Sequence, residues 1–178
     1  MPDQAPLSSA AAGASARRRL YLLFRIAADR YALDAADVIE VLGMRTFKQV
    51  PGTPPWVAGM FDCRGAVVPA IDLSALAGAG AATLVTSTRL ALVRYRPADA
   101  HDERLLGLIL EQATETAHYD PAAFQPAGLE TPQARYLGPV LSDSRGMVQA
   151  VKVADLLPEA VRTLLFPVAA TPEEGARA

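Results

Sequence analysis

The residues of this chain that could take part in catalysis or metal binding are few and scattered. The two histidines, His101 and His118, lie in stretches expected to be loops, without the paired cysteine or carboxylate spacing of a zinc site. The single cysteine, Cys63, has no histidine near it in the sequence, so it could be a nucleophile only if a base approached it in space. The run GAGAA at 78–82 lacks the Gly-Lys-Ser/Thr that completes a phosphate-binding loop.

Two acidic residues, Asp72 and Glu111, each end an apolar run. A pair of carboxylates can carry out acid–base chemistry when the fold holds them close together. Nothing in the sequence brings these two together, so we favour strand-end and helix-capping roles for them. The sequence therefore predicts a protein that is not an enzyme and that needs no cofactor or metal ion.

The elements that must position any site are mostly short strands. Runs rich in β-branched and aromatic residues alternate with turn residues, which is typical of small β-barrels. A doubly wound sheet would need long helices between its strands, and the sequence offers few. We expect strands at 21–26, 30–33, 47–50, 57–61, 66–71, 89–95, 104–110, 136–141 and 147–153.

The segment DAADVIEVLG at 34–43 has the pattern of a helix. Asp34 is a suitable N-cap, and Val38, Val41 and Leu42 have the spacing of one buried helical face. Glu40 falls off that apolar stripe, so we expect its side chain to be exposed.

Two further helical pieces and one irregular stretch complete the outline. We expect one helical turn at 72–76, an irregular Pro-rich stretch at 114–135, and a closing helix that begins near Pro158. The spacing of apolar residues in the closing helix predicts one buried face made of Val161, Leu164 and Leu165.

Composition indicates one globular domain or two intimate halves. The chain has 178 residues, 51% hydrophobic and 20% charged, with a net charge of −2. Nucleic-acid-binding proteins are usually basic and rich in stacking aromatics, whereas aromatic residues make up only 6% here. The ends at 1–18 and 168–178 have the composition of disordered tails, which leaves a folded domain at 19–167.

Targeting signals are weak. Three arginines at 17–19 followed by LYLLF resemble a twin-arginine export signal, but the apolar run is short and Arg25 interrupts it. No apolar run reaches the ~18 residues that a membrane-spanning helix needs. A lone cysteine fits a reducing compartment. We therefore expect a cytoplasmic protein without direct membrane insertion.

Several consecutive stretches resemble the CheW family of chemotaxis coupling proteins. They are FRIAADRYALDAADVIEVLG, VPGTPPWVAGMFDCRGAVVPAIDL, LLGLILEQATET and VKVADLLP, which together cover about residues 20–166 in unbroken order. The hairpin pattern Arg-Gly-x-Val-x-Pro is the most specific part of the match, and the other stretches support it.

The resemblance implies an all-β fold with small helices. Family members have two intertwined five-stranded SH3-like β-barrel subdomains that share a hydrophobic core, followed here by a C-terminal helix. It also implies a scaffold that bridges the cytoplasmic tip of a chemoreceptor and the regulatory domain of a CheA-type histidine kinase. Such a protein would associate peripherally with membrane receptor clusters.

The chain departs from the family pattern in places. Asp62 and Cys63 replace the usual Asn and Leu before the arginine, and Glu111 replaces an Asp. The stretches LVTSTRLALVRY, ARYLGPV and EAVRTLLFP are closer to the Wsp-type CheW-like proteins. Those serve surface-sensing systems whose output is a diguanylate cyclase and its product cyclic-di-GMP.

The resemblance also indicates partner-binding residues. Arg64, in the hairpin loop 62–65, is the first of them, because an exposed guanidinium can donate two parallel hydrogen bonds to one carboxylate. Glu40 could pair with Arg64 or present its own charge. Asp62, in the same loop, is a further candidate. Core packing explains Gly59 and Gly107 equally well, and we favour it over a contact surface for Trp56, Val57, Val38, Met60 and Val68.

Two other classes of protein stay open on the sequence alone. One is a β-barrel that binds a small ligand or a nucleic acid, which the acidic balance and scarce aromatics oppose. The other is an enzyme that uses Cys63 or the carboxylates.

Overall fold

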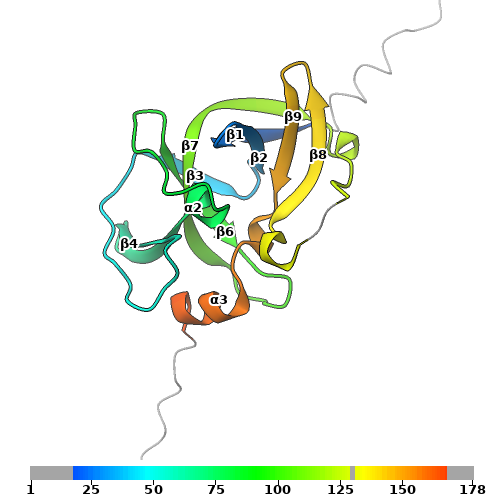
Figure 1. Ribbon diagram of the computed structural model, residues 1–178. Coiled ribbons are helices and arrows are strands. Elements are labelled where there is room, and N and C mark those ends of the chain that lie inside the picture. Colours follow the sequence, from blue (N-terminus) through cyan, green and yellow to red (C-terminus); the bar gives the residue numbers. More distant parts are fainter. Residues whose placement is uncertain (1–17, 129–130, 168–178) are drawn as a thin grey trace, which may run out of the picture.

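The computed structural model describes residues 18–128 and 131–167, so the predicted tails at 1–18 and 168–178 lie outside the described residues except for Arg18. The described part is mostly strand (Figure 1). The strands are β1 (Arg19–Ile26), β2 (Asp29–Asp34), β3 (Val38–Leu42), β4 (Val57–Cys63), β5 (Ala66–Asp72), β6 (Arg89–Tyr95), β7 (Arg104–Tyr119), β8 (Leu137–Asp143) and β9 (Gly146–Val151). The helices are α2 (Leu73–Leu76) and α3 (Glu159–Leu165), with 3₁₀ turns η1 (Pro121–Ala123), η2 (Pro132–Ala134) and η3 (Val153–Asp155).

The long strand β7 joins two curled five-stranded sheets. Its first half pairs with β5 and β6, and these bring in β4 and β3 to give the order β4-β5-β7-β6-β3. Its second half pairs with β1, and β2, β9 and β8 follow. We call these the first sheet and the second sheet. The all-β architecture with small helices confirms the predicted fold class.

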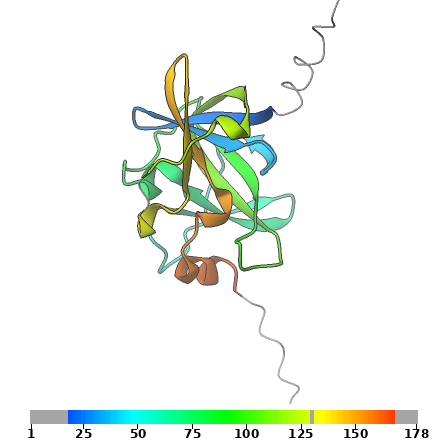
Figure 2. The same cartoon turned by 90° about the vertical axis from the view of Figure 1, so that its right-hand side faces the viewer.

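One hydrophobic cluster runs through both sheets. It contains Phe24 and Leu33 from the second sheet, Ile71 and Val93 from the first, and Leu108 from the shared strand β7. Val161 and Leu165 of α3 close the cluster at one end of the molecule, while the β8–β9 hairpin tip lies at the other end (Figures 1 and 2). The predicted third member of that helical face, Leu164, is instead 55% exposed.

The predicted helix at 34–43 is wrong, because its second half is the strand β3. The side chain of Asp34 accepts a hydrogen bond from the backbone N–H of Ala36 at 2.9 Å and makes a tight turn in place of a helix cap. After the turn, Val38, Ile39 and Val41 are β-branched and favour a strand, which pairs with β6. Burial therefore alternates along β3, and Ile39 and Val41 face solvent.

The predicted irregular stretch at 114–135 is wrong over its first residues, because β7 continues to Tyr119. Gln112 has a φ of 48°, and the register with β1 shifts beside it, so the strand passes from one sheet to the other at a bulge. Beyond the bulge most side chains are exposed and polar, which removes the apolar signal that identifies a strand.

Within the described ranges, no helix is long and apolar enough to cross a membrane.

Candidate functional site at the tip of the β4–β5 hairpin

The β4–β5 hairpin ends in a two-residue turn. Cys63 pairs with Ala66, and Arg64 and Gly65 between them have φ values of 55° and 82°. A turn with two positive φ values matches the twist of the hairpin strands, and glycine is well suited to it. Arginine in this left-handed conformation costs roughly 1 kcal/mol in backbone strain. The chain therefore has a long cationic side chain at a position whose left-handed backbone conformation is unfavourable for arginine.

Arg64 forms an ion pair with Glu40 of β3. Its Nη2 donates to Oε2 of Glu40 at 2.6 Å, and the two side chains are 75% and 33% exposed. Glu40 thus lies beside the hairpin tip as expected, although a strand carries it and its side chain is half-buried. Within the described residues the guanidinium makes this one hydrogen bond, so its other N–H groups are available to a partner.

An apolar groove of about 630 Å³ adjoins the tip. One wall is the segment 46–51, and the other is formed by Met60, Asp62 and Val67 of the hairpin. Val67 is 67% exposed, and Asp62 is its cross-strand partner. We call the groove together with Arg64 and Glu40 the Arg64 site.

Gly59 allows the groove wall to lie against β4. A Cβ at this position would be 2.4 Å from the backbone oxygen of Lys48, and its φ is 128°. Lys48 and Met60 exchange two backbone hydrogen bonds at 2.8 Å directly above it. Gly59 is therefore needed for the close approach of segment 46–51 and offers no surface of its own.

The other positions expected to contact partners lie deeper. Val57 and Val68 are buried, and Trp56 and Val38 are half-buried against the main core. A Cβ at Gly107 would meet the Phe61 ring at 2.8 Å, which places this glycine inside the first sheet. The structure therefore brings together Arg64, Glu40, Asp62 and Met60 and leaves the others in supporting positions.

Sequence reasoning missed the exposure of Val67. The run AVVPAI at 66–71 is apolar throughout and reads as a wholly buried strand. Only the pairing with β4, which sets alternate residues on opposite faces, shows that Val67 shares the groove with Met60 and Asp62.

The lone cysteine and the histidines are not brought together. Cys63 is half-buried and packs against the core of the first sheet. His101 and His118 are both exposed, and His118 lies on β7 rather than in a loop. In the described part of the chain, no group of three or more His, Cys, Asp or Glu residues is arranged to hold a metal ion.

Asp72, at the end of β5, and Glu111, inside β7, both hold the loop that follows α2. Asp72 accepts hydrogen bonds from the N–H groups of Ser74 at 2.9 Å and Ala82 at 2.7 Å. Glu111 accepts from the Ser74 hydroxyl and from the N–H of Thr83, both at 2.7 Å. Burial acts to raise the pKa of Glu111, but these hydrogen bonds outweigh it and lower the pKa, so the group stays ionised. Asp72 therefore ends a strand and caps α2 as predicted, whereas the strand-end role predicted for Glu111 is wrong, because β7 continues to Tyr119.

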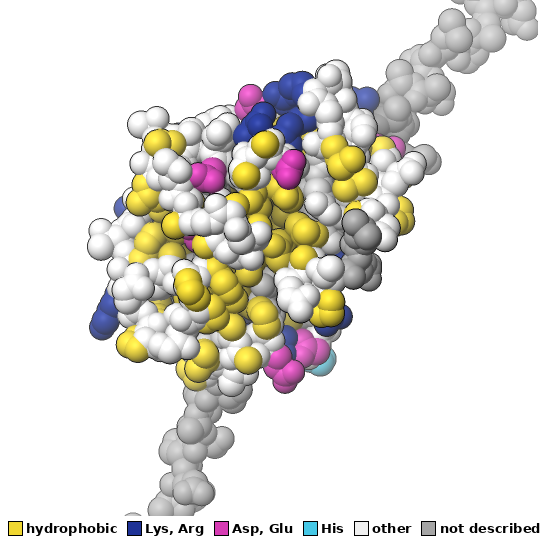
Figure 3. All heavy atoms as spheres, in the orientation of Figure 1, with side chains coloured by type: hydrophobic (Ala, Val, Ile, Leu, Met, Phe, Trp, Pro, Cys, Tyr) yellow, Lys and Arg dark blue, Asp and Glu magenta, His cyan; other side chains and the backbone are white. Residues whose placement is uncertain are grey.

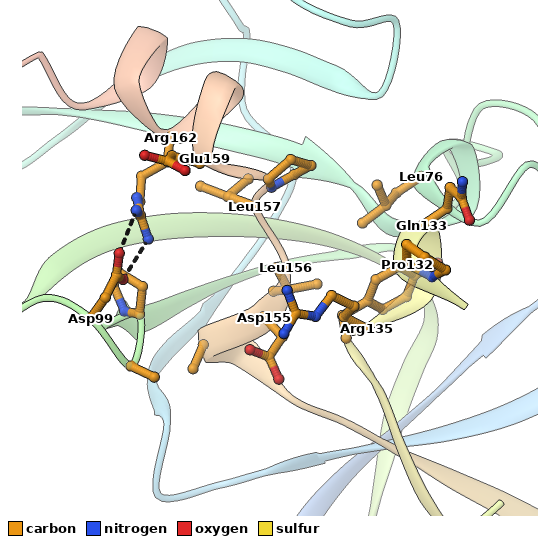
Figure 4. A pocket seen from close by; sticks show the side chains of 15 residues that line it. Leu76, Asp99, Pro132, Gln133, Arg135, Asp155, Leu156, Leu157, Glu159 and Arg162 are labelled. Atoms are coloured by element: carbon orange, nitrogen blue, oxygen red, sulfur yellow. Dashed lines mark hydrogen bonds and ion pairs between the residues drawn. The ribbon is translucent and has the colours of Figure 1, made fainter. Parts of the chain in front are cut away.

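A second cavity of about 500 Å³ lies between α3, η2 and η3 (Figure 4). Arg162 of α3 crosses to Asp99 and donates two hydrogen bonds of 2.8 Å to its carboxylate. Figure 3 shows apolar side chains along the middle of the face that Figure 1 presents to the viewer. Both polar and apolar residues line the cavity, and the guanidinium of Arg162 is already hydrogen-bonded to Asp99.

Comparisons with known proteins agree on one family. Residues 20–161 match the CheW-like domain. The chain is 27% identical over 106 residues to "Chemotaxis protein CheW" of Helicobacter pylori, which covers 60% of this chain and 61% of that protein. It is 24% identical over 111 residues to "Chemotaxis protein CheW" of Bacillus subtilis, covering 61% and 67%. The matched part thus spans about three fifths to two thirds of these relatives.

A solved structure has the same fold. The scaffolding protein TtCheW from Thermoanaerobacter tengcongensis superposes with a TM-score of 0.69 at 24% identity, covering 79% of this chain and 88% of that one. The family match covers most of the chain, and the strand order and shared core agree with it. The chain belongs to the CheW-like domain family.

Proposed function

We propose that this protein is a non-enzymatic coupling protein. In this proposal it links the cytoplasmic tip of a methyl-accepting chemoreceptor to the regulatory domain of a CheA-type histidine kinase, with the Arg64 site as one contact surface. Membership of the CheW-like family supports it, and so do the names of the relatives, which are chemotaxis and scaffolding proteins.

The observation that carries the proposal is the state of Arg64. Its side chain is 75% exposed, its backbone is in a costly conformation, and its one ion pair leaves most donors available. Residues with a strained backbone conformation are concentrated at binding sites and switch regions. A guanidinium beside an apolar groove matches the composition of protein interfaces, where arginine and exposed apolar groups are enriched.

The mechanism is passive. A scaffold without chemistry of its own transmits the state of the receptor only if it contacts the kinase or receptor differently in the two signalling states. We propose that the protein acts from the cytoplasm at receptor clusters, and that its pathway is of the Wsp surface-sensing type, on the sequence stretches noted above.

Reconstitution tests the function. Purified protein is mixed with the receptor cytoplasmic fragment and the kinase from the same organism, and co-sedimentation and kinase autophosphorylation are measured. We expect a ternary complex in which kinase activity depends on the receptor. If the protein co-sediments with neither the receptor fragment nor the kinase, the proposed coupling function is wrong.

The Arg64→Ala variant tests the site. We expect its free energy of unfolding to stay within about 0.5 kcal/mol of wild type, because exposed ion pairs contribute little. Binding of one partner should fall at least tenfold. Arg104→Ala is the matched control, since Arg104 is also an exposed, ion-paired arginine but lies elsewhere on the first sheet. Equal binding by both variants and wild type would exclude the Arg64 site as a contact.

A further inference from the structure

The hydroxyl of Tyr95 is a buried polar group without a partner. Tyr95 ends β6 and is fully buried, and within the described residues its hydroxyl oxygen makes no hydrogen bond. Such a hydroxyl costs free energy, because it loses its bonds to water and gains none from the protein. Native proteins contain few groups of this kind, so each one needs a physical explanation.

An ion pair lies close to this hydroxyl. Arg162 of α3 donates two hydrogen bonds of 2.8 Å to the carboxylate of Asp99, which belongs to the loop 96–103 between β6 and β7 (Figure 4). Burial raises the pKa of Tyr95, and the nearby Arg162 guanidinium opposes that rise. A guanidinium has five N–H groups, so the pairing with Asp99 leaves Arg162 with further donors beside the hydroxyl.

A cavity of about 450 Å³ is bounded by the same residues. Its wall combines two aromatic residues, Tyr95 and Phe166, with two cationic ones, Arg104 and Arg162. The rings of Tyr95 and Phe166 stack with their centroids 5.8 Å apart and their planes inclined by 15°. We call it the Tyr95 cavity. Its volume is in the range of sites that bind small molecules, which typically join an apolar wall to a few polar groups.

The charges of the wall favour an anion. Among its described lining residues, the two arginines face one carboxylate, Asp102, which lies 3.6 Å from Arg104. Asp99 holds Arg162 through a side chain that is 66% exposed. An exposed ion pair contributes little to stability, so another carboxylate can replace Asp99 on Arg162 at low cost. A neutral acceptor could bond to the hydroxyl but would not replace that charge.

We propose that the Tyr95 cavity binds a small aromatic carboxylate. The ligand's carboxylate takes the place of Asp99 on Arg162 and accepts a hydrogen bond from the Tyr95 hydroxyl. Its aromatic body packs against Phe166 and Pro97, which also lines the cavity. The ligand thereby supplies the hydrogen-bond partner that the hydroxyl otherwise lacks within the described residues.

This site is separate from the Arg64 site and does not depend on the proposed coupling function. No described residue lines both the Tyr95 cavity and the groove beside Arg64. The Tyr95 cavity is bounded by α3 and the loop 96–103, whereas the groove belongs to the β4–β5 hairpin and the segment 46–51. Failure of either proposal therefore leaves the other standing.

The experiment titrates the full chain with two probes while backbone amide chemical shifts are recorded. The probes are 1-naphthaleneacetate and its neutral analogue 1-naphthaleneacetamide. We expect the acetate to bind saturably, with its shifts concentrated in residues 95–104 and 162–166. The acetamide should bind about tenfold more weakly or less, because it cannot form charge-assisted hydrogen bonds with Arg162.

Two variants should change the affinity for the acetate in opposite directions. Tyr95→Phe should weaken binding about tenfold, which is the scale of one hydrogen bond to a charged group, while its melting temperature should not fall. Asp99→Asn should tighten binding about threefold, because it removes the competing charge of an exposed ion pair. Glu115→Gln is the matched control, since Glu115 is also exposed and paired to an arginine, Arg145, and it should bind as wild type does.

These results distinguish a binding site from a purely structural cluster. The proposal is overturned if the acetate shifts no amides in the two segments, or if the acetamide binds as tightly. It is also overturned if Tyr95→Phe binds as wild type does, or if that variant melts at a lower temperature, since the hydroxyl would then have a partner in the free protein. Binding by Asp99→Asn that is no tighter than that of wild type would contradict the assigned place of the carboxylate.

Discussion

At the scale of single residues, Arg64 and Gly59 lie near the same groove but matter to the fold to different degrees. Arg64 has an unfavourable backbone conformation and an exposed side chain, so the fold gains little from it. Gly59 has no side chain and is buried under the backbone of Lys48, so the fold depends on it. The sequence marks both residues as candidates, and only the structure shows that Arg64 is exposed and that Gly59 supports the fold.

We expect Gly59→Ala to destabilise the protein by roughly 3 kcal/mol, because the new Cβ meets a backbone oxygen at 2.4 Å and the φ of 128° is strained. Urea unfolding measures the free energy. Gly52→Ala is the matched control, since Gly52 has a φ of 81° but nothing within 4 Å, and its cost should stay near 1 kcal/mol. Equal costs would show that segment 46–51 moves aside freely.

At the scale of elements, the strands whose side chains meet the core could be predicted from sequence, and those without a buried face could not. β4, β5, β6 and β9 are apolar and were expected close to their observed bounds. The sequence of β3 predicts a helix, because its apolar residues have helical spacing. Only the hydrogen-bonded pairing with β6 shows that the segment is a strand. The second half of β7 is polar, so its pairing with β1 is a tertiary effect.

The Asp143 cluster fastens the β8–β9 hairpin to β2 and β7 and should make stability depend on pH. Hydrogen bonds from Arg30, and then from Tyr119 and the Arg145 N–H, outweigh burial and hold the pKa of Asp143 far below its usual 3.8. Its stabilisation is therefore fully present above pH ~4, where the unfolded chain is also ionised. It declines as the pH falls below that value, because the Asp143 carboxylate takes up a proton in the unfolded state while it is still ionised in the folded state.

We expect Asp143→Asn to lower the free energy of unfolding by about 2 kcal/mol at pH 7, because the partly buried Arg30 loses its counter-charge. The difference from wild type should narrow between pH 4 and pH 2 in urea titrations. Asp62→Asn is the control, since Asp62 is exposed and makes one weak hydrogen bond of 3.4 Å. A difference that stays constant over this range would contradict the assigned linkage.

At the scale of the whole molecule, two sheets share one strand and one core. The family resemblance implied the shared core, whereas the shared strand β7 was not predicted. The sequence supplies the number of hairpins but not which distant strands pair, such as β5 with β7 or β2 with β9. The Arg64 tip could be singled out from its motif.

A shared core predicts that both sheets unfold together. Trp56, the single tryptophan, packs against the common cluster from the first sheet, and the amide signals of β9 report on the second. We expect the two probes to give the same urea midpoint in wild type. Leu108→Ala, in the buried middle of β7, should shift both midpoints equally and cost about 3 kcal/mol. Loss of the Trp56 signal while β9 amides stay native would instead mean that the sheets unfold independently.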